Sequence, residues 1–207
     1  MKWKEDYSSD IPSTLSDVVD FLKVAMPIER LKISTIGPEG TSASFVGETL
    51  KEAAHPELDI DLLLAADFNS AMTSVLMKHS DFALVPSAYR DATAFHWNSE
   101  LVLEGCFVHH TPAYGLATKD GKLSEDSVIL ATMDEVESLF AQLATPEVQA
   151  RLADVIPAKS TSHAASLVGE GRATVAVCNE IGVYQNNLQW FKVREGVPIV
   201  WMLFAHK

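Results

Sequence analysis

The chain has 207 residues, of which 47% are hydrophobic, and its formal net charge at pH 7 is −12. This length and hydrophobic content suffice to bury a core, as one domain or as two small lobes, and they exclude a disordered chain. The acidic charge argues against nucleic acid and anionic membrane as partners, because both would repel the protein.

Two features bear on where the protein works. No apolar run reaches transmembrane length, and residues 1–6 (Met-Lys-Trp-Lys-Glu-Asp) do not form a signal peptide. Cys106 and Cys178 lie in apolar, strand-like runs, which favours two buried thiols over a disulfide and therefore a reducing compartment. We expect a cytoplasmic protein. The adjacent His109 and His110 lie on an extended run where successive side chains diverge, so no metal site is expected.

Residues 1–30 form a predicted N-terminal helical extension. Leu15, Val18, Val19 and Leu22 mark one face of an amphipathic helix that Pro27 ends. This face is expected to pack on the core or on a second subunit, which leaves a homodimer open, and no catalytic role is expected there.

A glycine turn at residues 37–42 (Gly-Pro-Glu-Gly-Thr-Ser) joins a predicted strand to a predicted helix. Gly37 and Gly40 permit backbone angles that a side chain would forbid. Thr41 and Ser42 stand at the N-cap, where the unpaired N–H groups and the helix dipole favour an anion. The spacing is equally typical of an ordinary strand-to-helix turn.

The first lobe is predicted from an alternation of strands and helices, and Asp67 is the expected N-cap of its second helix. The predicted strands are residues 31–36, 59–65 and 82–85. This order predicts a parallel sheet with right-handed crossovers. Open sheets of this kind bind ligands beyond the carboxyl ends of their strands, which is where residues 37–42 and 86–90 fall.

The sequence of the second half of the chain predicts another alternating α/β region. The extended runs 101–110 and 113–118 are expected to form the crossover into it. Residues 132–135 (Thr-Met-Asp-Glu) have the spacing of a capping box and predict a helix start. The residues expected inward on that helix are Val136, Leu139, Phe140 and Leu143. Further predicted strands are residues 128–131, 155–157, 174–178, 190–193 and 199–205.

Two more helix starts are predicted in this half. Ser160, Thr161 and Ser162 open a helix that Gly169 and Gly171 end, and Asn179 is the N-cap of the last helix. The strands at 190–193 and 199–205 are expected to return to the first lobe.

Three stretches, in matching order, resemble the prephenate dehydratase family: residues 37–42, Phe82-Ala83-Leu84-Val85-Pro86 and residues 160–165 (Ser-Thr-Ser-His-Ala-Ala). The resemblance covers roughly residues 31 to 204. Within that family the chain is similar to the small non-aromatising prephenate decarboxylases of natural-product pathways. The stretches that carry this likeness are residues 85–89, 111–117, 179–180 and 198–201.

The resemblance implies a two-lobed, periplasmic-binding-protein-like (type II) α/β fold with a cleft between the lobes, whereas periodicity alone predicts only alternating α/β. Lobe 1 would hold residues 31–108 and 182–207, and lobe 2 residues 109–181. No regulatory amino-acid-binding domain is expected, because the chain ends at Lys207.

The resemblance also implies a site for prephenate, whose two carboxylates suit two helix starts. One start offers Thr41 and Ser42, and the other offers Ser160, Thr161 and Ser162; each charge-assisted bond is worth about 1.5–3 kcal/mol. A plain N-cap remains the alternative for residues 160–162. Arg90 either adds a charge at the mouth of the cleft or is a solvated surface residue.

Three residues are candidates for the chemistry: Tyr89, Asn179 and Glu180. Tyr89 and Tyr114 offer hydroxyls to the ring alcohol, although an aromatic in an extended run is more often core. Glu180 is either solvated or, if a closing cleft raises its pKa, a proton donor.

Two departures from the family pattern bear on the reaction. The dehydratase tripeptide Thr-Arg-Phe is missing from residues 195–202, and Pro-x-Glu-Asn-Ser reads Pro-Ser-Ala-Tyr-Arg at residues 86–90. The expected activity is therefore decarboxylation of prephenate to a dihydro-4-hydroxyphenylpyruvate, without a cofactor. The alternatives are a dehydratase that forms phenylpyruvate and a small-molecule binding protein without turnover.

Overall fold

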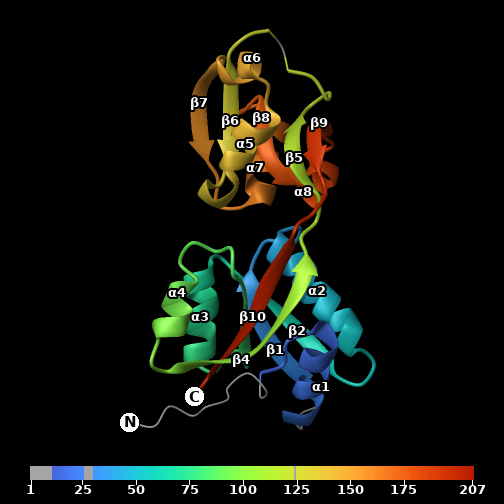
Figure 1. The fold of residues 1–207 in the computed structure, drawn as a ribbon, viewed down its shortest axis with the longest axis vertical. Coiled ribbons are helices and arrows are strands. Elements are labelled where there is room, and N and C mark those ends of the chain that lie inside the picture. Colours follow the sequence, from blue (N-terminus) through green and yellow to red (C-terminus); the bar gives the residue numbers. More distant parts are fainter. Residues whose placement is uncertain (1–10, 26–29, 124) are drawn as a thin grey trace. The chain divides into compact units, whose positions relative to one another are not determined.

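The structure is a computed structural model that describes residues 11–25, 30–123 and 125–207. The chain divides into two compact units, each built on one five-stranded sheet (Figure 1). Of the described residues, unit 1 holds those up to 39, 43–110 and 198–207, and unit 2 holds 40–42 and 111–197.

The sheet of unit 1 has the strand order β2-β1-β3-β10-β4. Strand β1 pairs in parallel with β2 and β3, whereas β10 is antiparallel to both β3 and β4. The elements are α1 (Leu15–Ala25), β1 (Arg30–Ile36), α2 (Ser42–Ala54), β2 (Asp59–Ala65), α3 (Phe68–Leu76), β3 (Phe82–Pro86), α4 (Thr93–Trp97), β4 (Leu101–His110) and β10 (Pro198–His206).

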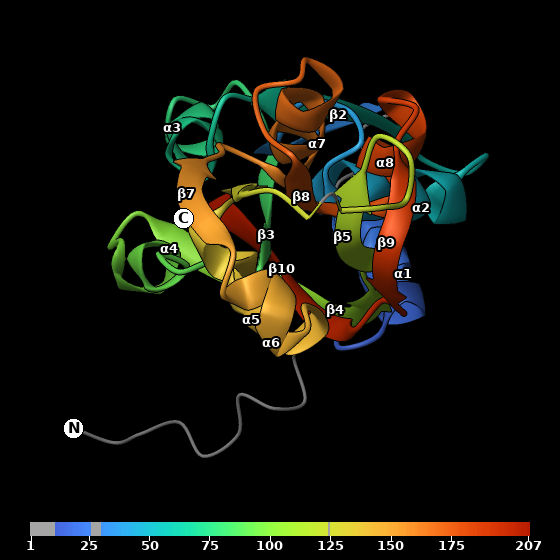
Figure 2. The same ribbon diagram turned by 90° about the horizontal axis from the view of Figure 1, so that it is seen from above.

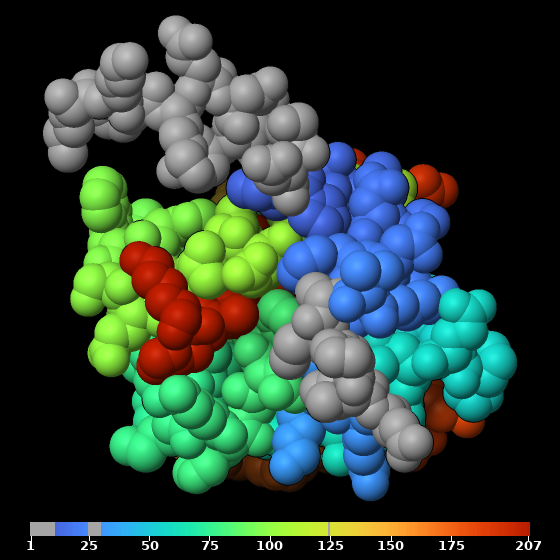
Figure 3. Space-filling view, turned by 90° about the horizontal axis from the view of Figure 1, so that it is seen from below, coloured from blue at the N-terminus to red at the C-terminus, as the bar shows by residue number. Residues whose placement is uncertain are grey.

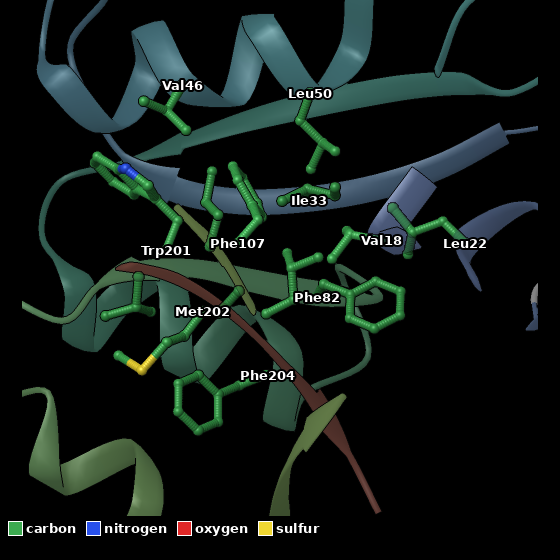
Figure 4. Packing of buried hydrophobic residues seen from close by; sticks show 14 of the residues in the cluster. Val18, Leu22, Ile33, Val46, Leu50, Phe82, Phe107, Trp201, Met202 and Phe204 are labelled. Carbon is green, nitrogen blue, oxygen red and sulfur yellow. The ribbon is translucent and has the colours of Figure 1, made fainter. Parts of the chain in front are cut away.

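Helices cover both faces of this sheet, with α1 and α2 on one side and α3 and α4 on the other (Figure 1). Successive side chains of a strand point to opposite faces, so β10 supplies both halves of the core. Trp201 points with Phe107 of β4 toward Val46 of α2, whereas Met202 and Phe204 point the other way (Figure 4).

Helix α1 is part of the core of unit 1. Val18, Val19 and Leu22 are at most 4% exposed and pack with residues of the sheet and of α2. The backbone N–H of Cys106 on β4 donates to the carbonyl of Pro12, 2.8 Å away, just before the helix. Of the two expectations for this helix, packing on the core is confirmed; Pro27 lies outside the described residues.

The sheet of unit 2 has the order β7-β6-β8-β5-β9, which repeats the pattern of unit 1. Strand β6 is parallel to β7 and β8, and β5 is antiparallel to β8 and β9. The elements are β5 (Tyr114–Thr118), β6 (Val128–Thr132), a 3₁₀ turn η1 (Asp134–Val136), α5 (Ser138–Leu143), α6 (Pro146–Gln149), β7 (Leu152–Pro157), α7 (Thr161–Gly169), β8 (Val175–Asn179), α8 (Glu180–Gln185) and β9 (Gln189–Arg194).

The two faces of this sheet carry residues of different size. Leu116, Leu130 and Val177 pack in one cluster with Phe140 of α5, whereas the smaller residues between them pack in a second cluster with α7. The small residues are Ala117, Ala131, Ala176 and Cys178. Short side chains leave room for α7 to pack close to the sheet.

Two sequence predictions are wrong in this unit. Strand β9 does not return to the first lobe but pairs with β5, beside which it lies in both views (Figures 1 and 2), so the return falls at residue 198 rather than 182. The spacing at residues 132–135 does not form a capping box: Thr132 Oγ1 donates to the carbonyl of Met133, and the 3₁₀ turn η1 follows before α5. Helix α6 of this unit was not predicted, and neither was α4 of unit 1.

The chain ends at the surface of unit 1, where the N–H of Lys207 donates to the carbonyl of Glu100, 2.9 Å away (Figure 3). Among the helices in the described part of the chain, none is both long enough and apolar enough to cross a membrane.

The core position of α1 predicts a stability difference between two valines. Val18→Ala removes fully buried methyl groups and should lower the free energy of unfolding by about 2 kcal/mol, whereas Val24, 83% exposed on the same helix, should tolerate the same change. Urea unfolding followed by circular dichroism measures both variants. Equal unfolding midpoints would contradict the assignment of α1 to the core.

Candidate functional site

The glycine turn ends in a segment that belongs to unit 2. Gly40 has φ +91°, a left-handed conformation that favours glycine, as the sequence predicted. A Cβ on Gly40 would lie 2.7 Å from Oε1 of Gln185 and 3.0 Å from Cγ2 of Ile181, so the turn packs directly against α8. Thr41 follows at the N-cap of α2, and its side chain is buried.

The phenol of Tyr114, at the start of β5, connects two helix starts. Its hydroxyl lies 2.6 Å from Oγ of Ser42, the first residue of α2, and it also hydrogen-bonds with Thr161, the first residue of α7. Burial raises the pKa of the phenol, and the bonds to Ser42 and Thr161 offset this only in part. Tyr114 is therefore a neutral hydroxyl at neutral pH.

The first turn of α7 contains a polar atom without a partner. Ser160 caps the helix, since its Oγ accepts from the N–H of His163 at 3.1 Å; this is the plain N-cap that the sequence left open as the alternative. Thr161 and Ser162 are 3% and 7% exposed. The Oγ of Ser162 is fully buried, and within the described part of the chain it has no hydrogen-bond partner. A buried hydroxyl left in this state costs free energy, so it marks a place where a ligand could supply the missing bond.

Asn179 lies at the end of β8 and is completely buried. Its Oδ1 accepts from the N–H of Gly182 at 2.8 Å, which makes it the predicted N-cap of α8. Its Nδ2 donates to the carbonyl of Gly40, also at 2.8 Å. Both ends of the amide are engaged inside the protein, so the geometry gives Asn179 a structural contact with the turn. Its expected part in the chemistry stays a prediction.

The remaining candidate residues, Glu180, Tyr89 and Arg90, are each at least partly exposed. Glu180 is exposed at the first position of α8, and its N–H donates to the carbonyl of Ala113 at 2.9 Å. Tyr89 and Arg90 belong to unit 1. The ring of Tyr89 is partly buried and lies 4.5 Å from that of Phe68, centroid to centroid, and Arg90 is exposed.

Unit 2 thus brings Thr41, Ser42, Tyr114 and Thr161 together, with Asn179 behind the turn. The sequence did not predict that Gly40 packs against α8 or that it bonds to Asn179. The only local signal was the presence of an asparagine at residue 179, because Gly40 is 139 residues away along the chain.

The cysteines and histidines do not form a metal centre in the part of the chain that the structure describes, where no group of three or more His, Cys, Asp or Glu could hold an ion. His109 places Nδ1 2.8 Å from the carbonyl of His110. Both cysteines are free; Cys178 is buried, as predicted, whereas Cys106 is only partly buried. Burial raises the pKa of the Cys178 thiol to about 12.

Solved structures of low sequence identity share the fold of this chain. The chain aligns with a prephenate dehydratase from Arthrobacter aurescens at a TM-score of 0.59 and 16% identity, over 86% of this chain and 61% of that one. It aligns with a periplasmic substrate-binding protein from Coxiella burnetii at a TM-score of 0.57 and 16% identity, over 86% and 85% of the two chains. The chain has the α/β fold shared by these proteins and spans less than two thirds of the dehydratase.

Similarity in sequence is more specific. The chain is 29% identical to the prephenate decarboxylase of Bacillus subtilis (strain 168), over 84% of this chain and 86% of the relative. It is 27% identical to the prephenate decarboxylase of Planktothrix agardhii, over 87% and 90% of the two chains. No protein-family model matches the chain.

The partly buried phenol of Tyr114 predicts a pH effect on stability. The pKa of Tyr114 is higher in the folded protein than in an unfolded chain, where a tyrosine titrates near about pH 10. As the pH rises above that value, the unfolded chain loses a proton that the folded protein keeps, so stability falls.

Between about pH 9 and about pH 11, the melting temperature of the Tyr114→Phe variant should therefore fall less than that of the unchanged protein. At neutral pH the loss of the Ser42 contact should cost about 1 kcal/mol. Tyr184→Phe, at a residue that is 84% exposed, is the matched control and should change neither quantity. The same alkaline slope in all three proteins would contradict the burial of Tyr114.

Proposed function

We propose that the chain is a non-aromatising prephenate decarboxylase, which forms a dihydro-4-hydroxyphenylpyruvate as a step in natural-product biosynthesis. The structural observation that carries the proposal is the buried, unpartnered Oγ of Ser162 in the first turn of α7, next to Thr161. Backbone N–H groups and hydroxyls at a helix start bind a carboxylate well. The identity of the substrate is taken from relatives that are prephenate decarboxylases.

Prephenate carries two carboxylates, and the proposal assigns each to one helix start. Thr41 and Ser42 at the start of α2 would hold one carboxylate, and Ser160, Thr161 and Ser162 at the start of α7 would hold the other. Arg90 of unit 1 would add a positive charge. The net charge of −12 disfavours the approach of a dianion. Hydroxyls and N–H groups at the two helix starts can bind the carboxylates nevertheless, because their dipoles act at short range.

In the proposed reaction the bond between the ring and its carboxylate breaks and CO2 leaves. The electron pair enters the cyclohexadiene, and one proton is taken up at a ring carbon. The ring hydroxyl stays, so no aromatic ring forms. Tyr114, a neutral hydroxyl, would hold the ring alcohol, and Tyr89 or Glu180 would supply the proton. The reaction balances without a cofactor.

We propose that the reaction takes place in the cytoplasm; the free thiols of Cys106 and Cys178 are compatible with a reducing compartment. A homodimer stays a prediction, which size-exclusion chromatography with light scattering can test.

The reaction predicts its own product. Incubation with prephenate in deuterated water should release CO2 and give a non-aromatic product that keeps the ring hydroxyl and carries one deuterium on a ring carbon. Ultraviolet spectra and mass spectrometry measure these features, after subtraction of the phenylpyruvate that prephenate forms without enzyme.

Two other outcomes would decide against the proposal. Enzymatic phenylpyruvate as the main product would establish a dehydratase. A rise in melting temperature with unchanged prephenate would establish a binding protein, the alternative that the fold of the Coxiella burnetii protein keeps open.

Removal of the unpartnered hydroxyl of Ser162 should have opposite effects on stability and on activity. Ser162→Ala removes a buried hydroxyl that has no partner, so the free energy of unfolding should stay the same or rise by about 1 kcal/mol. If Ser162 binds the substrate, kcat/KM should fall about tenfold or more.

Ser166 on the same helix is the matched control, since its Oγ already donates to the carbonyl of His163 at 2.9 Å. Ser166→Ala should lower stability slightly and leave kcat/KM within about twofold. A folded Ser162→Ala variant with unchanged kinetics would remove Ser162 from the site.

A further inference from the structure

We infer that Asn179 is a positioning residue: its side-chain amide holds the Gly40–Thr41 peptide against α8 and thereby sets the orientation in which Thr41 and Ser42 meet the substrate. The inference rests on the proposed function only for the identity of that substrate. The contact itself can be tested without any turnover.

The geometry of the amide leaves one arrangement. Gly182 offers an N–H group, which can only donate, and Gly40 offers a carbonyl, which can only accept. Asn179 therefore faces Gly182 with Oδ1 and Gly40 with Nδ2. Both bonds are 2.8 Å long and completely buried, so water does not compete with them.

The bond to Gly40 controls a group that the substrate would meet. The carbonyl of Gly40 and the N–H of Thr41 belong to one planar peptide unit and point in opposite directions. Fixing the carbonyl therefore fixes the direction of the Thr41 N–H at the start of α2. On the other side of Thr41, the hydroxyl of Ser42 is fixed by Tyr114 at 2.6 Å. Thr41 is thus held between two anchored neighbours.

The bond to Gly40 needs the NH2 group of an amide, whereas the helix cap does not, and this difference separates the positioning role from capping. Aspartate or serine caps a helix about as well as asparagine, because the cap needs only an oxygen acceptor. The Nδ2 donor has no part in the cap of α8, and its partner is Gly40. The side chain of Gln185 and Cγ2 of Ile181 lie within 3.0 Å of the position that a Cβ of Gly40 would take, so the same helix also packs against the turn.

The decisive variant is Asn179→Ser, which keeps a capping oxygen but is too short to reach Gly40. Hydrogen exchange measured by mass spectrometry should show amides of residues 40–44 exchanging about fivefold faster, as expected for the loss of one hydrogen bond. Asn186→Ser is the matched control, because Asn186 uses the same Nδ2 group to bond the carbonyl of Gly182 within α8 at 2.9 Å. In that control residues 40–44 should exchange as in the unchanged protein.

With prephenate, Asn179→Ser should raise KM about three- to tenfold and leave kcat within about twofold, because a carboxylate held by the turn is bound in the ground state and in the transition state alike. Asn186→Ser should change neither constant. A fall confined to kcat would overturn the positioning role and assign Asn179 a direct part in the chemistry.

Asn179→Asp provides a test that does not depend on the serine variant folding. A charged carboxylate facing the Gly40 carbonyl is unfavourable, whereas the protonated acid can donate the missing bond. The deficit in melting temperature against the unchanged protein should therefore shrink as the pH falls toward about 5. Asn186→Asp, at a partly exposed residue, should show no such recovery.

The outcomes separate the two proposals. If residues 40–44 exchange alike in Asn179→Ser and Asn186→Ser, the positioning role is wrong, whatever the protein does to prephenate. If exchange rises only in Asn179→Ser while the unchanged protein does not turn over prephenate, the positioning role stands and the proposed function fails.

Discussion

The hydrogen bond between Asn179 and Gly40 is the contact on which the arrangement of the site depends. Residues 40–42 are counted with unit 2, although the chain on either side of them is counted with unit 1. Within unit 2, Asn179 bonds to Gly40 and Tyr114 bonds to Ser42. Because Asn179 also caps α8, the backbone of the turn and the start of that helix are tied to one side chain.

The chemistry of the site follows from what surrounds it. A protein with a net charge of −12 repels an anion at long range, so the binding of an anion must rely on local groups close to it. The start of α7 and the residues at the start of α2 supply hydroxyls and N–H groups, and burial keeps the phenol of Tyr114 uncharged. A neutral donor can approach a carboxylate without the cost of a buried charge, which suits a site where the substrate itself brings the charge.

The fold by itself does not select among the functions that use it. Both sheets have the same strand order, and the same fold serves enzymes and periplasmic substrate-binding proteins. Three observations on this chain bear on its function: the unpartnered Ser162, the phenol that joins two helix starts, and the likeness to prephenate decarboxylases over most of the chain. The substrate assignment therefore rests on the site and the relatives together.

The sequence by itself determined the local structure, because caps and strand faces depend on near neighbours. It predicted Asp67 and Asn179 as N-caps, a helix start at residues 160–162, the glycine turn that contains Gly40 and most strands. It also showed, through resemblance, the family of folds. Only the tertiary structure decided which strands pair, so β9 was assigned to the wrong lobe: a period of two tells which face a residue occupies but not which strand lies beside it. The sequence could not predict the Asn179–Gly40 bond, because the two residues are 139 positions apart and only packing brings them together. It also could not predict that Ser162 Oγ has no hydrogen-bond partner, because local spacing does not encode which groups surround a buried hydroxyl.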